Sequence, residues 1–168
     1  TEAKYQIVAD NTYDWEYWMS PEGRFLYTSP SCQRITGYSA NDFASDPGLL
    51  MRIVHPDDRA EFEYHGGQDQ KSCATREFEF RIVHRDGSTR WVGHVCQSVF
   101  DAHGHFLGRR GSNLNISDRK KAETALLRQN FLLTEINRLG IGLASLPSRE
   151  SIHAYLAYIF VVLILLLL

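Results

Sequence analysis

The clearest structural pattern in this 168-residue chain lies in residues 77–118, which read EFEFRIVHRDGSTRWVGHVCQSVFDAHGHFLGRRGSNLNISD. Apolar and polar residues alternate over 78–83, and residues 91–100 are rich in the β-branched and aromatic side chains that are typical of strands. Turn signals at 85–88 and 102–105 each contain a glycine, which tolerates the positive φ of a tight hairpin. The stretch therefore predicts an antiparallel meander of three strands, and a helical pattern follows it directly.

Two shorter runs nearer the N-terminus predict a further hairpin. Trp15, Tyr17 and Met19 are spaced by two and would share one face of a strand. The turn signal at 20–23 contains proline and glycine, and it leads into a return strand over 24–28. The chain therefore contains residues for five strands in two groups.

Three helix starts are predicted between the hairpin and the meander. Ser29 is expected to cap a helix that opens with Pro30, and Ser39 to cap a second short helix. Residues 55–59 read HPDDR, in which the proline suits a helix opening and Asp57 and Asp58 favour the positive end of the helix dipole. Short helices are therefore expected to lie between the two groups of strands.

These motifs resemble the PAS domain family, in the subgroup with the patterns E-x-R-x-x-x-x-D-G-x-x-R-W, D-x-x-G-x-x-x-x-x-x-G and D-I-T-x-R-K-x-A-E. The HPDDR element at 55–59 is similar to a further motif of this subgroup. The last pattern departs twice, with Asn115 in place of Asp and Ser117 in place of Thr. The matching residues are Glu79, Arg81, Asp86, Gly87, Arg90, Trp91, Asp101, Gly104, Gly111, Ile116, Arg119, Lys120, Ala122 and Glu123.

The resemblance implies an α+β PAS fold: a five-stranded antiparallel sheet with short helices on one face and a C-terminal connector helix. We expect a lead-in helix at 1–11, the PAS domain at 12–117 and a signalling helix at 118–146. Residues that recur in this helix at intervals of four and three predict the seam of a coiled coil and hence a homodimer. They are Ala122, Leu126, Gln129, Leu133 and Ile136.

The C-terminal residues 147–168 are expected to be the truncated start of a following domain or of a membrane segment. Residues 136–158 resemble the approach helix and first helix of a GAF domain. The apolar run 154–168 is shorter than the roughly 18–20 residues that span a bilayer. Because the sequence begins with Thr1 and ends in leucines, we expect it to be a fragment of a longer protein.

The composition limits the partners and the compartment. Eighteen basic residues stand against twenty acidic ones, so there is no electrostatic signature of nucleic-acid binding. Cys32, Cys73 and Cys96 are widely spaced and form no Cys-x-x-Cys pair, which indicates reduced thiols in the cytoplasm. The full-length protein is expected to be cytoplasmic or associated with a membrane.

No metal site is expected from the histidines. His84, His94, His103 and His105 could gather around the meander. However, a His-x-His pair in a β-turn faces solvent, and no acid or cysteine stands at a firm metal-ligand spacing. We therefore expect no bound metal ion.

No cofactor is expected either. His65 lies roughly where haem-binding PAS domains carry their axial histidine, but Gly66 and Gly67 follow it and would end the helix there. An exposed histidine at a helix C-terminus is the expected interpretation, with haem as the alternative. The flavin-binding relatives need a cysteine within an N-C-R-F-L-Q type element, and Cys32 has different neighbours.

Two sets of residues remain as candidate functional sites. PAS folds enclose a small-ligand pocket, which polar or small residues of the strands could line; here they are Tyr17, His94, Cys96 and Asn113. A filled core in which these groups satisfy one another is the alternative. The second set lies where the last strand becomes the helix and would relay a signal; it comprises Asn115, Ser117, Asp118 and Arg119.

In the PAS family an acid at the end of the last strand pairs with a base just after it. Asn115 replaces that acid, so Asp118 and Arg119 are expected to cap and anchor the helix, with a looser coupling than usual.

The sequence contains no catalytic motif, so this region is not expected to be an enzyme. The function expected is that of a sensory module in a histidine kinase or a cyclic-di-nucleotide enzyme such as a diguanylate cyclase. It would bind a small ligand or a partner and act on an output domain of the same chain. The alternative is a ligand-free dimerisation module with a filled core.

Overall fold

The computed structural model describes residues 2–67, 75–144 and 148–167. The chain divides into two compact units, Thr1–Lys120 and Lys121–Leu168. The helices and strands are, in order, α1 (Glu2–Asp10), β1 (Trp15–Met19), β2 (Phe25–Thr28), α2 (Ser31–Thr36), α3 (Ala40–Ser45), α4 (Leu49–Ile53), the 3₁₀ turn η1 (Pro56–Asp58), α5 (Arg59–Gly67), β3 (Arg76–Val83), β4 (Thr89–Phe100), β5 (Phe106–Asn115), α6 (Ser117–Ala144) and α7 (Arg149–Leu167).

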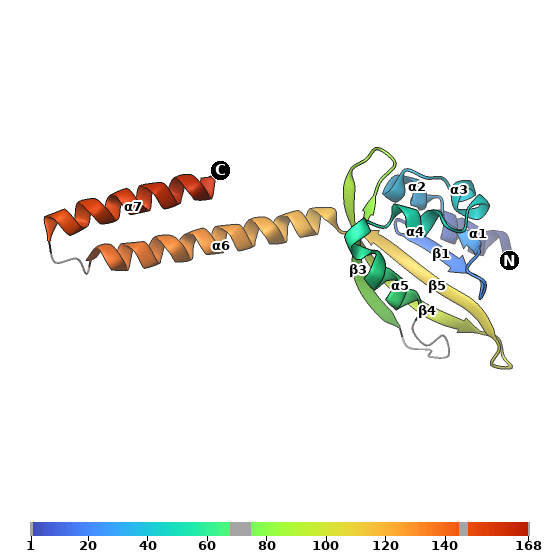
Figure 1. Cartoon of the computed structure of the whole chain (residues 1–168). Helices are drawn as coiled ribbons and strands as arrows, with labels where there is room; N and C mark the ends of the chain where they lie inside the picture. Colours follow the sequence, from blue (N-terminus) through green and yellow to red (C-terminus); the bar gives the residue numbers. More distant parts are fainter. Residues whose placement is uncertain (1, 68–74, 145–147, 168) are drawn as a thin grey trace. The chain divides into compact units, whose positions relative to one another are not determined.

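The first unit is built on one five-stranded antiparallel sheet with the strand order β2-β1-β5-β4-β3. The short helices α2 to α5 gather over one side of this sheet (Figure 1). The hairpin β1-β2 joins the meander β3-β4-β5 through the pairing of β1 with β5. The predicted α+β fold, its meander and its N-terminal hairpin are therefore confirmed.

The core lies between the sheet and the short helices, because alternate strand residues point toward those helices. Trp15, Phe80 and Ile82 contribute buried side chains from the sheet, and Phe43 contributes one from α3. The rings of Trp15 and Phe43 lie 4.9 Å apart. Burying a large side chain of this kind stabilises the folded state by about 1.5–3 kcal/mol.

The helix starts follow local sequence signals with one exception. Ser39 caps α3 in a capping box with Asp42, as predicted. Ser29 does not cap α2, which begins at Ser31 and has no side-chain cap. The Ser29 hydroxyl instead accepts a hydrogen bond from the backbone N–H of Glu16 at 2.9 Å, so it ties the start of α2 to β1.

The HPDDR element begins a helical segment as predicted, but its second aspartate binds the sheet. The carboxylate of Asp58 accepts hydrogen bonds from the backbone N–H of Arg81 at 2.7 Å, from its Nε at 3.0 Å and from its Nη2 at 2.6 Å. These bonds lower the pKa of Asp58. The element therefore fixes the beginning of α5 on β3; we call this Asp58–Arg81 contact the clamp.

The second unit consists of most of α6 together with α7. Leu126, Leu133 and Ile136 of α6 are each more than half exposed, so the residues of the predicted seam offer an apolar surface. Among the described residues, the structure has no helix that is both long and apolar enough to cross a membrane. The GAF-like interpretation of residues 136–158 stays a prediction.

Candidate functional site

The four residues predicted to line a pocket lie together on the core side of the sheet. Tyr17 comes from β1, His94 and Cys96 from β4, and Asn113 from β5, and all four are buried. The pairing of the three strands brings His94 opposite Asn113. We call these four residues the core cluster.

His94 and Asn113 satisfy each other inside the core. Nδ1 of His94 lies 2.8 Å from Oδ1 of Asn113, and because a carbonyl oxygen only accepts, Nδ1 carries the proton and donates. Burial lowers the pKa of His94 to about 4, so the imidazole is neutral near pH 7. Its Nε2 therefore keeps a free lone pair.

Tyr17 packs on this pair from β1. Its ring is stacked on that of His94 with centroids 6.1 Å apart, and burial raises the pKa of its hydroxyl group. The ring lies over β5 where Gly111 has no side chain, since an added Cβ there would lie 2.5 Å from Tyr17 Cζ. Gly111 is therefore the residue that makes room for Tyr17.

His65 completes the cluster from α5. Its Nε2 lies 3.3 Å from Sγ of Cys96, and its ring is stacked on Phe78 at 4.9 Å. The expectation of an exposed histidine was wrong: His65 is half-buried because its face of α5 packs on the sheet. Burial lowers the pKa of His65 and raises that of the Cys96 thiol.

The other histidines of the meander lie apart from the core cluster. His103 and His105 are exposed in the β4-β5 hairpin, where Asp101 accepts a hydrogen bond from each backbone N–H. Nδ1 of His84 accepts a hydrogen bond from the backbone N–H of Asp86 at the β3-β4 turn. His84 and the adjacent pair of His103 and His105, whose ring centroids lie 6.1 Å apart, thus lie away from His94. His65 and His94 are instead brought together, with ring centroids 5.2 Å apart.

The predicted relay residues lie where β5 becomes α6. Oδ1 of Asn115 accepts a hydrogen bond from the backbone N–H of Ser117 at 3.0 Å. The hydroxyl of Ser117 in turn accepts one from the backbone N–H of Trp91 on β4 at 2.9 Å. Asp118 lies within the first turn of α6, and Asn115 accepts from the N–H of the first residue of this helix. The start of α6 is therefore held by both β4 and β5.

Arg119, which is predicted to anchor the helix, forms an ion pair with Glu79 on β3. The Glu79 carboxylate lies 2.6 Å from Nη2 of Arg119 and 2.5 Å from Nζ of Lys120. Hydrogen bonds from Lys120 and Arg119 lower the pKa of Glu79. The acid missing at Asn115 on β5 is therefore supplied by β3, the edge strand beyond β4.

Comparison with known proteins agrees with this architecture. A family profile described as PAS fold matches residues 25–113. The chain belongs to the PAS family. The crystal structure of a sensory box histidine kinase/response regulator from Burkholderia thailandensis E264 is similar to this PAS chain, with a TM-score of 0.60 and 23% identity over 79% of this chain and 98% of that one.

Two further similar proteins have names that state a signalling function. The N-terminal domain of a diguanylate cyclase with PAS/PAC sensor from Marinobacter aquaeolei has a TM-score of 0.58, 19% identity and coverage of 64% of this chain and 98% of that chain. The blue light receptor lreB of Aspergillus flavus is 32% identical over 104 residues, which are 60% of this chain and 18% of that protein. The present chain therefore spans less than a fifth of the length of this curated relative.

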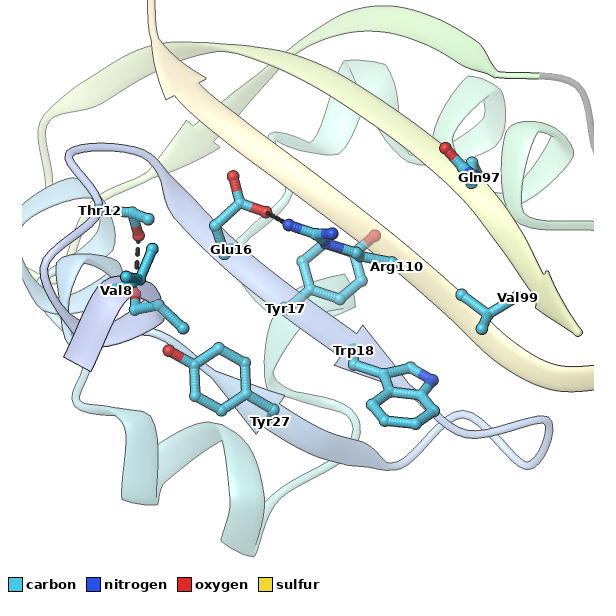
Figure 2. Close-up of a pocket in the computed structure, with 10 residues that line it drawn as sticks. Val8, Thr12, Glu16, Tyr17, Trp18, Tyr27, Gln97, Val99 and Arg110 are labelled. Atoms are coloured by element: carbon cyan, nitrogen blue, oxygen red, sulfur yellow. Dashed lines mark hydrogen bonds and ion pairs between the residues drawn. The ribbon is translucent and has the colours of Figure 1, made fainter. Parts of the chain in front are cut away.

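The PAS domain also has a cavity of about 710 Å³ that sequence reasoning did not anticipate. Figure 2 shows Val8 of α1, Trp18 of β1 and Val99 of β4 among the residues around it. Glu16 and Arg110 form an ion pair of 3.6 Å beside it. Trp18 alternates with the buried Tyr17 along β1, so this cavity opens on the face of the sheet opposite the core cluster.

Proposed function

We propose that this chain is the sensory module of a larger signalling protein, and that a change in the core cluster is passed to α6. The observation that carries the proposal is that the His94–Asn113 pair lies in the same two strands that hold the start of α6. Asn113 lies two residues before Asn115, which caps the helix. Trp91 of β4 donates to Ser117 in its first turn.

The buried polar pair is a suitable receiver for a signal. A satisfied polar pair in an apolar core is sensitive to any added group, because one lost partner leaves an unpaired buried donor or acceptor that costs about 1–3 kcal/mol. A ligand at Tyr17, His94, Cys96 or Asn113 would therefore favour a different arrangement of β4 and β5. Since α6 begins on both strands, it would respond in its first turn.

On this proposal, the domain that produces the signalling output lies elsewhere in the full-length protein. The similar PAS domains come from a histidine kinase and a diguanylate cyclase, which supports either as the output domain. This module then needs no catalytic residue of its own and no nucleic-acid partner. We place it in the cytoplasm as a homodimer that signals through α6.

Hydrogen exchange of the purified chain tests the relay. Glu79→Gln removes the charge that holds Arg119 and Lys120, and it should speed amide exchange at residues 117–121 about 5-fold, as expected for losing an exposed ion pair of about 1 kcal/mol. Glu77→Gln is the matched control, because Glu77 is exposed and two residues away on the same strand. His94→Gln should change exchange at 117–121 as well; unchanged exchange there would refute the relay.

A ligand-free dimerisation module is the second candidate, and the exposed apolar residues of α6 favour it. Native mass spectrometry and an absorbance spectrum of the fresh chain separate the two. A dimer with an added small-molecule mass supports the sensor, and a dimer with no added mass, in which His94→Gln leaves α6 unchanged, supports the dimerisation module. Leu133→Asp should produce monomers in either case, because it places a charge within the apolar stripe.

A further inference from the structure

Three side chains of two different elements form a cluster of the kind that binds a soft metal ion. His65, His94 and Cys96 each offer one ligand atom, and these atoms all lie within 4.8 Å of one another. The His65 Nε2 to Cys96 Sγ distance is 3.3 Å. Ligand atoms around a tetrahedral or trigonal ion with bonds of about 2.0–2.3 Å are themselves roughly 3.3–4.0 Å apart. We infer that His65, His94 and Cys96 bind a copper(I) ion through two imidazole nitrogens and one thiolate.

The hydrogen bond from His94 to Asn113 prepares His94 as a ligand. Metal-bound histidines characteristically donate their second ring N–H to a carbonyl or carboxylate oxygen, which fixes the ring and its tautomer. Nδ1 of His94 makes this bond to Asn113 Oδ1 at 2.8 Å, so Nε2 is left to bind the ion. His94 and Cys96 are two residues apart on β4, so both side chains point to the same face of the sheet.

The charge around the cluster favours a monovalent ion. One thiolate neutralises Cu⁺, whereas Zn²⁺ would leave a net positive charge beside the apolar Phe78 and Phe80. The guanidinium of Arg109 donates to the carbonyl of Gly66, next to His65, so a positive charge already lies near the cluster. Thiolate and imidazole are soft and borderline ligands that suit Cu⁺.

His65 can be reached from the surface of the domain. It lines an open recess of about 490 Å³ together with the acidic residues Glu61 and Glu77 and the basic residue Arg76. On binding, Cu–N bonds form to the two neutral imidazoles and a Cu–S bond replaces the S–H bond of Cys96. The thiol proton leaves to solvent and no electron is transferred. The site stands on this geometry alone, whereas a role for copper as the sensed signal rests on the proposed function.

The test is an anaerobic titration of the reduced 168-residue chain with Cu⁺ in competition with bicinchoninate, with native mass spectrometry for the stoichiometry. We expect one Cu⁺ per chain and a thiolate-to-copper absorption band in the ultraviolet. Cys96→Ser should abolish the band and weaken binding more than 100-fold. Asn113→Ala should keep the band and weaken binding about 10–100-fold. Cys32→Ser and Cys73→Ser are the thiol controls and should bind as the unaltered chain does.

Circular dichroism of each metal-free variant checks that it folds. If Cys96→Ser does not fold, Asn113→Ala still tests the site, because it keeps all three ligands. Binding that survives Cys96→Ser, or that depends on Cys73, would overturn the site and leave a thiol–imidazole hydrogen bond. Tighter binding of Zn²⁺ than of Cu⁺ would overturn the choice of ion.

Hydrogen exchange at residues 117–121 then separates the two proposals. Copper binding with unchanged exchange there supports the site and rejects copper as the signal. No copper binding, with exchange still altered in His94→Gln, rejects the site and leaves the sensory module standing.

Discussion

The clamp between Asp58 and Arg81 gives the most direct test of how this domain is held together. Asp58→Asn keeps the size of the side chain and one acceptor oxygen, which can still accept from the Arg81 backbone N–H. It removes the negative charge and turns an amide NH₂ toward the guanidinium of Arg81. The substitution therefore isolates the charged part of the contact.

The structure sets the size of the effect. The Asp58 side chain is 16% exposed and accepts two bonds from the guanidinium, so its charge is shielded from water. Removing one partner of such a charge-assisted pair costs about 2–3 kcal/mol. For a unit of this size the melting temperature should fall by roughly 10 °C. Asp57→Asn is the matched control: Asp57 is 68% exposed and meets Arg81 at 3.3 Å, so it should cost less than about 1 kcal/mol.

Urea unfolding as a function of pH identifies the cause. The folded-state pKa of Asp58 lies below the unfolded value of about 4, so its contribution is complete above that value and is lost as pH falls through the folded pKa. The stability difference between the unaltered chain and Asp58→Asn should be constant above pH 5 and shrink below pH 4. The contributions of the other carboxylates to the pH dependence are the same in both proteins and cancel in the difference. A difference no larger than that of Asp57→Asn, or one that does not change with pH, would refute the reasoning.

Two further substitutions have opposite expected signs. Asn115→Asp places a charged acceptor at the N–H of Ser117. It should increase the free energy of unfolding by about 0.5–1 kcal/mol and therefore raise the melting temperature; an unchanged or lower melting temperature contradicts this. Gly111→Ala puts a Cβ 2.5 Å from the ring of buried Tyr17 and should cost about 1–3 kcal/mol in urea unfolding. Gly66→Ala, with nothing within 4 Å of its Cβ, should cost less, and equal losses would argue against the clash.

Local sequence signals were sufficient for the sheet. Alternation fixes which residues of a strand face the core, since a slip by one residue would reverse every side chain. Phe80 and Ile82 are buried as their spacing predicted, and Glu79, the residue before Phe80, is exposed. The turn glycines Gly87 and Gly104 have φ of 87° and 83°, the conformation for which glycine is needed.

The same local signals failed where a side chain had two partners to choose between. Ser29 has the residue type of a helix cap, but its hydroxyl lies beside β1 and binds the N–H of Glu16 instead. His65 precedes two glycines, which predicted a frayed, exposed helix end. Its position depends instead on how α5 lies across the sheet, which is a long-range property. For the cluster of His65, His94 and Cys96, the sequence offered one signal, the spacing of His94 and Cys96 by two residues on one strand. That signal does not include His65, the third member of the cluster.

That third member is positioned by the clamp. Asp58, Phe62 and His65 are four and three residues apart, so they fall along one face of the helical segment from η1 to α5. Each meets β3: Asp58 binds Arg81, Phe62 packs on Phe80 at 4.8 Å and His65 stacks on Phe78 at 4.9 Å. The contacted positions fall from 81 to 78 as the helix advances, so the segment runs antiparallel to β3. Fixing Asp58 therefore fixes the direction of His65 two turns later, and the HPDDR element that marks a helix start also places Nε2 of His65 beside the thiol of Cys96.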